Sequence, residues 1–471
     1  GFVSSTNSQE SSSANAPLFR SVSLPWNKSV ITEPSTKPVD KNDLTESLFE
    51  TEWVSLPSGG SEPSSGLGSY LMISRDEINI ELPQGWQGIQ VSDKKELEAI
   101  LTQKAWTHVA MLSTGHEEDV KLALWLLQAV GRNTDSRIKQ ICFATKFGST
   151  DDAGLWGLSR TFRLEYPEIR TQCLEYKNTQ YLLSAIGQCF ERSEEDEFLS
   201  DQNGKIHVSR LRRCTDIESS TKLSLRGDAS YIISGGQGAL GLVAVDLLVR
   251  RGAKYIVLLS RSSMKPEVED KLINLRKHAN IELLSCDVSQ EVDVLYAKAW
   301  LERKKWPAVR GIVHTAGVLS DGTIQNQSSE KLQVSYSAKV NGARYLHDTF
   351  MPPDFLLLFS SAAATFGSAG QGNYAAANAT LDALALKWSR SGDSVLSVQW
   401  GAWSDGGMAE RHSAVKRAET TGVGSISNEL GEKAIEQLLA SGKKGVVCII
   451  PIDWSNLQLD IPLISRLIKP N

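Results

Sequence analysis

The stretch Tyr231-Ile-Ile-Ser-Gly-Gly-Gln-Gly-Ala-Leu-Gly241 places a glycine-rich loop between an apolar strand and the apolar, helix-like segment 242–249. Glycines allow a tight turn there and let backbone N–H groups approach a phosphate closely, while the N-terminus of the following helix favours negative charge. A purely structural turn is the alternative, but the flanking strand and helix favour a dinucleotide site. The predicted contacts are Gly235, Gly236, Gly238, Leu240 and Gly241.

A second part of the predicted cofactor site is Ser260-Arg261-Ser262, which ends the next apolar run. An acidic residue at this point binds the ribose hydroxyls of NAD, whereas an arginine can clamp the additional phosphate of NADP. The sequence therefore predicts NADPH, with a solvated surface arginine as the alternative. Later strand ends add the remaining predicted contacts: Asp287, Val288, Thr315, Ala316 and Gly317. We expect the neighbouring His314 to be structural.

The fold class follows from the order of apolar runs around these motifs. Strand-like runs recur at 231–234, 255–259, 281–284, 311–314, 355–359, 395–400 and 445–450, mostly separated by helix-length segments. This order predicts a doubly wound, parallel Rossmann-type sheet. An earlier α/β region has no glycine loop after its strand-like run Tyr70–Ile73, so we expect it to bind no dinucleotide. The prediction is an α/β protein with two Rossmann-like subdomains, of which the second is complete and the first truncated.

The predicted domain boundaries follow composition. Residues 1–43 are rich in Ser, Asn, Pro and Lys and are expected to be a flexible linker. Residues 44–227 form the predicted structural subdomain, 228–462 the predicted catalytic, NADPH-binding subdomain, and 463–471 a predicted C-terminal linker. Because the chain begins at Gly1 rather than Met, we expect it to be a piece of a longer protein.

Composition excludes several classes of function. The 471 residues carry a net charge of −5 without a basic stripe, which argues against nucleic-acid binding. No apolar run approaches membrane-spanning length, and no signal peptide opens the chain. The 6 cysteines lack a CxxC pair and lie mostly in apolar runs, so they are expected to be buried, reduced thiols. We predict a cytoplasmic protein without a metal site.

The candidate chemistry lies between the run 355–359 and the helix predicted to begin near Tyr374. Ser361 falls at the carboxyl end of a strand, where open α/β sheets bind ligands. Tyr374 and Asn378 share one helical face. A serine hydroxyl can hold a carbonyl oxygen while a tyrosine phenol delivers a proton, which is what carbonyl reduction requires. Lys339 lies in a separate helical segment, and on its own a helix lysine is usually solvated.

These motifs together resemble the short-chain dehydrogenase/reductase superfamily. Most of its members carry Tyr-x-x-x-Lys, whereas here the fourth residue after the tyrosine is Asn378. Ketoreductase domains of modular type I polyketide synthases and animal-type fatty acid synthases exchange these lysine and asparagine positions, and the segment around Lys339 matches theirs. The resemblance therefore implies four catalytic residues: Tyr374, Ser361, Lys339 and Asn378.

The resemblance covers residues 44 to about 460. The segment 154–167 is similar to the structural subdomain of polyketide synthase ketoreductases, which binds no cofactor and braces the catalytic one. The segment 406–422 matches the region that forms a mobile helical lid over the substrate in that family.

The resemblance also implies a stereochemical outcome. B-type ketoreductases carry Leu-Asp-Asp after His-Thr-Ala-Gly, and this chain has Leu319-Ser320-Asp321, which retains the last aspartate. A-type enzymes carry a tryptophan where this chain has Phe366. Some epimerising B types carry a proline where this chain has Ala369. The pattern implies a B-type enzyme that forms a D-β-hydroxyl without epimerisation.

The function implied is NADPH-dependent reduction of a β-ketoacyl thioester carried by an acyl carrier protein, with flanking polyketide synthase domains as further partners. The alternative is a redox-inactive, NADPH-binding or epimerising scaffold domain. Such domains usually lack one of the four residues, and this chain has all of them.

Overall fold

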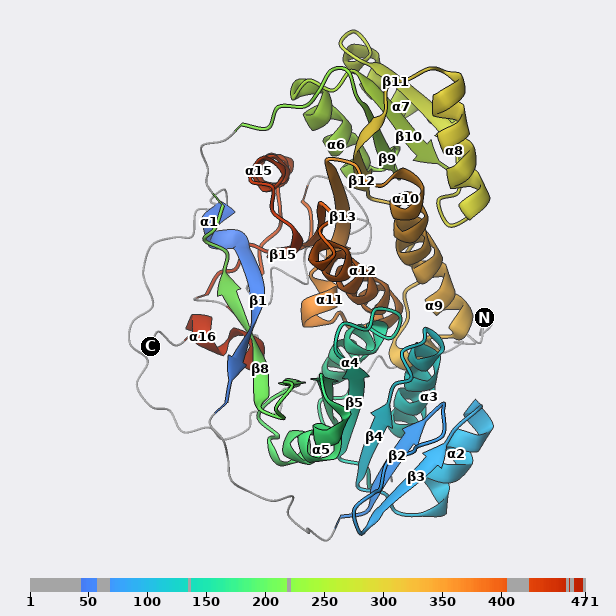
Figure 1. Cartoon of the computed structure of the whole chain (residues 1–471), viewed down its shortest axis with the longest axis vertical. Coiled ribbons are helices and arrows are strands. Elements are labelled where there is room, and N and C mark those ends of the chain that lie inside the picture. Colours follow the sequence, from blue (N-terminus) through green and yellow to red (C-terminus); the bar gives the residue numbers. More distant parts are fainter. Residues whose placement is uncertain are drawn as a thin grey trace, which may run out of the picture. The chain divides into compact units, whose positions relative to one another are not determined.

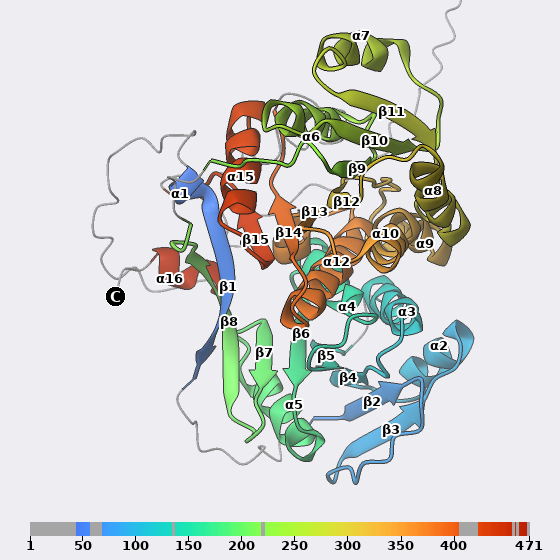
Figure 2. The same cartoon turned by 45° about the horizontal axis from the view of Figure 1, so that its top comes forward.

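The computed structural model describes residues 44–56, 68–133, 137–217, 222–404, 423–454, 457 and 461–468. The predicted linker 1–43 lies outside this part of the chain, and so does the predicted lid at 406–422. Figures 1 and 2 show the described helices and strands in two orientations.

The described strands form one 15-stranded sheet, ordered β11-β10-β9-β12-β13-β14-β15-β1-β8-β7-β6-β5-β4-β2-β3. The strands of the second half are β9 (Ser230–Ser234), β10 (Tyr255–Ser260), β11 (Asn280–Ser285), β12 (Val309–His314), β13 (Phe355–Ser361), β14 (Val395–Trp400) and β15 (Gly445–Ile449). All seven pair in parallel, and each overlaps a run predicted from the sequence.

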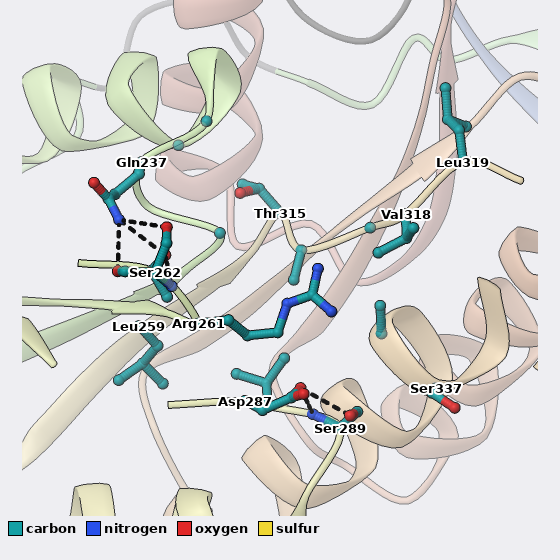
Figure 3. Close-up of a pocket in the computed structure, with 18 of the residues that line it drawn as sticks. Gln237, Leu259, Arg261, Ser262, Asp287, Ser289, Thr315, Val318, Leu319 and Ser337 are labelled. Carbon is teal, nitrogen blue, oxygen red and sulfur yellow. Dashed lines mark hydrogen bonds between the residues drawn. The ribbon is translucent and has the colours of Figure 1, made fainter. Parts of the chain in front are cut away.

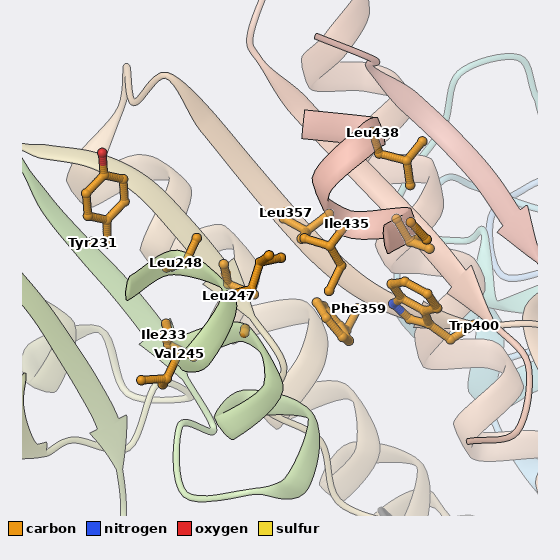
Figure 4. Close-up of a cluster of buried hydrophobic side chains, with 14 of the residues drawn as sticks. Tyr231, Ile233, Val245, Leu247, Leu248, Leu357, Phe359, Trp400, Ile435 and Leu438 are labelled. Atoms are coloured by element: carbon orange, nitrogen blue, oxygen red, sulfur yellow. The ribbon is translucent and has the colours of Figure 1, made fainter. Parts of the chain in front are cut away.

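Helices cover both faces of this second half. They are α6 (Ala239–Arg250), α7 (Pro266–Leu275), α8 (Glu291–Arg303), α9 (Ser329–Tyr336), α10 (Gly342–Phe350), α11 (Ala363–Phe366), α12 (Gly372–Arg390) and α15 (Asn428–Ala440). Side chains of a strand alternate between faces, so Leu357 and Phe359 pack with α6 and α15 (Figure 4), whereas Leu358 packs on the α12 side. The doubly wound arrangement thus buries β13 on both faces and fixes where its carboxyl end lies.

The first half contributes strands β1 to β8, of which β2 to β7 pair in parallel and β8 pairs antiparallel with both β7 and β1. Its elements are α1 (Leu44–Ser47), β1 (Leu48–Ser55), β2 (Tyr70–Ser74), β3 (Trp86–Gln90), α2 (Lys94–Gln103), β4 (His108–Leu112), α3 (Glu118–Arg132), β5 (Gln140–Lys146), α4 (Gly154–Glu165), β6 (Arg170–Tyr176), η1 (Thr179–Tyr181), α5 (Leu182–Glu191), β7 (Glu197–Ser200) and β8 (Ile206–Arg213). The sequence did not predict β3, β7 or β8. These strands are short or carry several polar residues, so their apolar pattern is weak.

The two halves share one sheet because β1 joins them. It pairs antiparallel with β15 on one side and with β8 on the other, and Figure 1 shows β1 and β8 side by side. The sequence indicated two similar halves in series but not that their sheets join.

The predicted C-terminal linker 463–471 differs from the structure in its described part. Residues Pro462–Ile464 form η4 and Ser465–Ile468 form α16. Leu463 and Ile464 are buried against Phe49 and Ile450, where they cover the region in which β1 meets β15. Apolar side chains in this short segment therefore make it part of the core.

The first half fills its own anion-binding position with a carboxylate. The N–H groups of Thr114, Gly115 and His116, between β4 and α3, all donate to one oxygen of buried Asp119 at 2.8 to 3.2 Å. Backbone N–H groups at such a strand–helix junction are the usual phosphate ligands. Their occupation supports the prediction that this half binds no dinucleotide.

All six cysteines are free and buried, which confirms the prediction of buried thiols. Among the described residues, no helix combines the length and apolar character needed to cross a membrane.

Candidate active site

A cavity of about 1330 Å³ lies at the carboxyl ends of the strands of the second half (Figure 3). It is lined by every predicted cofactor contact except one: Gly235, Gly238, Leu240, Gly241, Ser260, Arg261, Ser262, Asp287, Val288, Thr315, Ala316 and Gly317. The exception is Gly236, where a Cβ would come within 2.9 Å of the Leu258 side chain. Gly236 therefore lets the loop pack against β10 and does not face the cavity.

The glycine loop needs its glycines for geometric reasons. Gly235 has a φ of +69°, and a Cβ there would lie 2.9 Å from the Ala316 nitrogen. A Cβ at Gly241 would lie 2.6 Å from the carbonyl oxygen of Gly235. Gly238 precedes α6 as its N-cap. The loop thus presents a helix N-terminus to the cavity at close range, as a pyrophosphate requires.

Gln237 is a residue of the site that the sequence analysis missed. Its buried amide Nε2 donates to Ser260 Oγ at 2.9 Å and to the Ser262 carbonyl at 3.0 Å, and its Oε1 accepts from the Lys265 nitrogen at 2.9 Å. Figure 3 shows these bonds to the Ser260–Ser262 turn. Gln237 therefore fixes the loop that carries Arg261. The available signal in the sequence was a glutamine inside the glycine loop, where its side chain can form hydrogen bonds with a neighbouring turn.

Arg261 extends into the cavity between Gln237 and Asp287 (Figure 3). Among the described residues, nothing forms a hydrogen bond or an ion pair with its guanidinium, so this charge is available to a ligand. Asp287 instead accepts hydrogen bonds from the backbone and hydroxyl of Ser289 at 3.0 and 2.8 Å. Asp287 thus shapes the turn after β11.

The four candidate catalytic residues lie close together; none of them lines the cavity itself, but Lys339 directly follows the lining residues Ser337 and Ala338. Burial raises the pKa of Tyr374, while hydrogen bonds from Ser361 and Asn378 act in the opposite direction. The Lys339 ammonium lies 5.5 Å from the centre of the Tyr374 ring. The Asn378 amide also donates to the Tyr374 carbonyl at 2.8 Å, as expected for residues one turn apart on α12.

Lys339 owes its position to an irregular helix. Residues Ser337–Asn341 form η3, a π-helical turn between α9 and α10. Such turns often occur at functional sites because they redirect a side chain. The Lys339 side chain is 2% exposed, and its Nζ donates to the carbonyl of Phe359 at 2.7 Å. The sequence predicted a helix here but not the π-turn.

His314 stabilises the π-helical turn by hydrogen bonding. Its Nε2 donates to the Lys339 carbonyl at 2.9 Å, and its Nδ1 accepts from Ser234 Oγ at 2.6 Å. Burial lowers the pKa of His314 to about 3, so the ring is neutral at neutral pH. His314 thus has the contacts of a structural residue, as we expected.

The predicted stereocontrol residues lie in different surroundings. Leu319 lines the cavity. Asp321 accepts a hydrogen bond from Gln371, three residues before Tyr374, at 3.1 Å. Phe366 does not line the cavity and packs against the core cluster that includes Phe49 and Ile450.

Helix α4 of the first half holds the loop between Ser361 and Tyr374. Glu165 accepts from the Gly370 nitrogen at 2.8 Å and from the Ile324 nitrogen at 2.7 Å. Arg160 donates to the Ala364 carbonyl and pairs with buried Glu197. The contacts of Glu165 and Arg160 with the second half join residues 159 to 205 positions apart, so no local sequence pattern could predict them.

A comparison with known families agrees with this geometry. Residues 229–405 match the family model described as KR domain. The matched segment contains the glycine loop and all four candidate catalytic residues, and it is similar to the KR domains of polyketide synthases. KR domains belong to the short-chain dehydrogenase/reductase superfamily and bind a nicotinamide cofactor, which agrees with the glycine loop found in this segment.

The curated relatives that the chain matches are much longer proteins. The chain is 27% identical over 385 residues to the 6-methylsalicylic acid synthase of Aspergillus niger, a match that covers 78% of this chain and 21% of that protein. It is 29% identical over 419 residues to the polyketide synthase GfsE of Streptomyces halstedii, covering 85% of this chain and 10% of that protein. The chain thus spans a small part of the length of these relatives.

Solved structures confirm the predicted α/β, Rossmann-like fold. The ketoreductase from the first module of phoslactomycin biosynthesis in Streptomyces sp. HK803 is 25% identical with a TM-score of 0.76, and the match covers 90% of this chain and 99% of that one. A structure of A-type ketoreductases from a modular polyketide synthase has the same fold, with 24% identity, a TM-score of 0.79, and coverage of 90% and 98%.

Proposed function

We propose that this KR domain uses NADPH to reduce a β-ketoacyl thioester, carried by an acyl carrier protein, to the D-β-hydroxyacyl thioester during polyketide chain extension. The observation that carries the proposal is the clustering of Ser361, Lys339 and Asn378 around Tyr374, with Lys339 directly after two residues of the cavity that the glycine loop lines. Neighbouring polyketide synthase domains are the other proposed partners.

The residues present fit a dinucleotide phosphate. The glycine loop leaves no room for a Cβ at Gly235 or Gly241, which brings the backbone and the N-terminus of α6 close to the cavity. Arg261 offers a guanidinium, unpaired within the described chain, that matches the additional phosphate of NADPH. Bound NADPH supplies the hydride.

The proposed roles of the catalytic residues follow from their chemistry. Ser361 holds the substrate carbonyl oxygen, and the Tyr374 phenol gives it a proton as negative charge develops there. The nearby Lys339 ammonium stabilises the phenolate that remains. Asn378 hydrogen-bonds the phenol and thereby orients it for transfer.

The proposed D configuration rests on Leu319 and Asp321. Leu319 lines the cavity, and Asp321 is hydrogen-bonded to Gln371 near the proton donor. These contacts support a role for the segment in orienting the substrate. The B-type assignment remains a prediction from the sequence.

The direct test of this function is a spectrophotometric assay with a short α-methyl-β-ketoacyl thioester. We expect NADPH absorbance to fall only when the thioester is present, and chromatography to resolve a single D-alcohol without epimerisation. No loss of absorbance would favour the redox-inactive alternative. An L-alcohol would contradict the role given to Asp321 while leaving the reduction intact.

Replacing Arg261 by Ala tests the choice of cofactor. We expect the dissociation constant for NADPH to rise roughly 10- to 100-fold, because charge-assisted hydrogen bonds to a phosphate contribute on the order of 1.5–3 kcal/mol. NADH, which lacks that phosphate, should bind Arg261→Ala and the parent chain equally. Fluorescence titration measures both constants. Arg303→Ala, on α8 and stacked on Tyr296, is the matched control; equal losses for NADPH and NADH would contradict the assignment.

A further inference from the structure

Lys339 carries a buried charge that the contacts described above do not balance. Its Nζ has one hydrogen bond, to the Phe359 carbonyl, and among the described residues it forms no salt bridge. Burial lowers its pKa to about 8. An ammonium buried without a partner is costly, so a compensating negative charge is expected nearby.

Asp382 is the carboxylate whose negative charge raises the pKa of Lys339, whereas burial lowers that pKa. Asp382 lies on α12, about two turns after Tyr374, and its side chain is 6% exposed. One carboxylate oxygen accepts from Ser397 Oγ at 2.6 Å and the other from Gln399 Nε2 at 2.7 Å. Asp382 makes no salt bridge among the described residues.

The sheet beneath Asp382 carries polar residues where its other side chains are apolar. On β14, Leu396, Val398 and Trp400 face α6 and α15, so Ser397 and Gln399 face α12. On β13, Ser360 follows the same alternation, and its side chain also lowers the pKa of Asp382. Two donors on β14 therefore converge on one carboxylate, which is the arrangement that keeps a buried aspartate ionised.

These donors partly offset burial, which raises the pKa of Asp382 to about 6. Asp382 is therefore predominantly ionised at neutral pH. Arg160 also lowers the pKa of Asp382 by its positive charge. Arg160 already has a carboxylate partner, however, because it forms a salt bridge with Glu197 at 2.6 Å. The thiol of Cys448 on β15, whose pKa burial raises, is neutral.

Tyr374, on the same helix as Asp382, is also neutral because burial raises its pKa. Lys339 is thus the cation near Asp382 that no carboxylate pairs within the described chain. The positive charge of Lys339 and the negative charge of Asp382 therefore compensate each other.

We propose that Asp382 is the buried counter-charge of Lys339 and serves the site through it, as a positioning residue that touches neither substrate nor cofactor. By holding the ammonium charged beside Tyr374, Asp382 favours the phenolate that follows proton transfer. This consequence rests on the proposed reduction. The coupling between the two side chains does not, and it can be measured without cofactor or substrate.

The test is a pH titration of Lys339 by NMR on the cofactor-free chain labelled with ¹³C at lysine Cε, with the resonance assigned by its loss in Lys339→Met. In Asp382→Asn, which keeps the side-chain shape but removes the charge, we expect the Lys339 midpoint to fall by about one pH unit or more. Ser397→Ala removes a donor but keeps the carboxylate, so its midpoint should stay near the parent value. An unchanged midpoint in Asp382→Asn would overturn the proposal.

Kinetics give a second readout that a merely structural role would not produce. At pH 7, Asp382→Asn should lower kcat while KM and the NADPH dissociation constant stay near their parent values, and its activity optimum should move to lower pH. Equal losses in all three constants would contradict a role through Lys339. An inactive parent chain would refute the proposed function but leave the titration valid.

If Asp382→Asn does not fold, the same titration of the parent chain tests the proposal. As the pH falls through about 6, protonation of Asp382 should shift the Lys339 Cε resonance although the ammonium stays charged. A flat resonance between about pH 5 and 7 would overturn the proposal, since a nearby titrating charge perturbs such a signal.

Discussion

The Tyr374→Phe variant is expected to bind NADPH with nearly the parent affinity and to turn over a β-ketoacyl thioester about 10²- to 10⁴-fold more slowly. The substitution removes only the phenolic oxygen, which is the proposed proton donor and a hydrogen-bond partner of Ser361 and Asn378. The ring remains in place beside Lys339. Steady-state rates and a fluorescence titration with NADPH separate the two effects.

The matched control is Tyr296→Phe, which removes the same atom from a tyrosine that is 49% exposed on α8. It should leave both rate and affinity unchanged. If Tyr374→Phe kept the parent rate, the proposed mechanism would be wrong. If it lost NADPH affinity to the same extent as rate, Tyr374 would be a cofactor contact rather than a proton donor.

The Gly157→Ala variant is expected to be less stable by about 2–3 kcal/mol, the cost of overpacking a close contact. A Cβ on Gly157 of α4 would lie 2.4 Å from the Ala375 backbone of α12, next to Tyr374. Because backbone atoms on both sides must move, we also expect a roughly 10²-fold lower kcat, as small misplacements of catalytic groups cause. Urea denaturation and steady-state kinetics measure the two effects.

The sign of this prediction is informative, because alanine is a better helix former than glycine by about 1 kcal/mol. A more stable Gly157→Ala variant would show that α4 and α12 are not in close contact. Leu164→Ala, which trims a side chain that is 39% exposed on the same helix, is the control and should keep full activity. A destabilised variant with the parent kcat would show that the contact between α4 and α12 stabilises the fold but does not position Tyr374.

Local patterns in the sequence were sufficient for much of the fold and the site. Apolar runs bounded by glycine, serine or aspartate placed β9 to β15, because each of these strands is largely buried between helices. The predicted cofactor contacts came from residues at strand ends, and all but Gly236 line one cavity because parallel strands bring their carboxyl ends to one edge. Lys339 required the family resemblance, because its partners lie on other elements.

The remaining features depend on tertiary contacts. The π-turn at Lys339, the bonds from Glu165 to Gly370 and the clamp formed by Gln237 join residues without a shared local pattern. Phe366 entered the stereochemical prediction through the family resemblance, and its side chain packs toward the core where β1 meets β15. The alternation Ser397-Val-Gln399 in a buried strand was a readable signal for Asp382, because buried polar side chains need partners.

The most direct test of the proposed function is the fate of deuterium carried at both hydrogen positions on C4 of the nicotinamide in NADPH. After incubation of the chain with the labelled cofactor and a β-ketoacyl thioester, mass spectrometry should find the deuterium on the β-carbon of a D-β-hydroxyacyl thioester. With Tyr374→Phe the labelled product should fall to trace levels. A β-hydroxy product without deuterium, or no product while NADPH still binds, would contradict the assignment of this chain as an NADPH-dependent β-ketoacyl reductase.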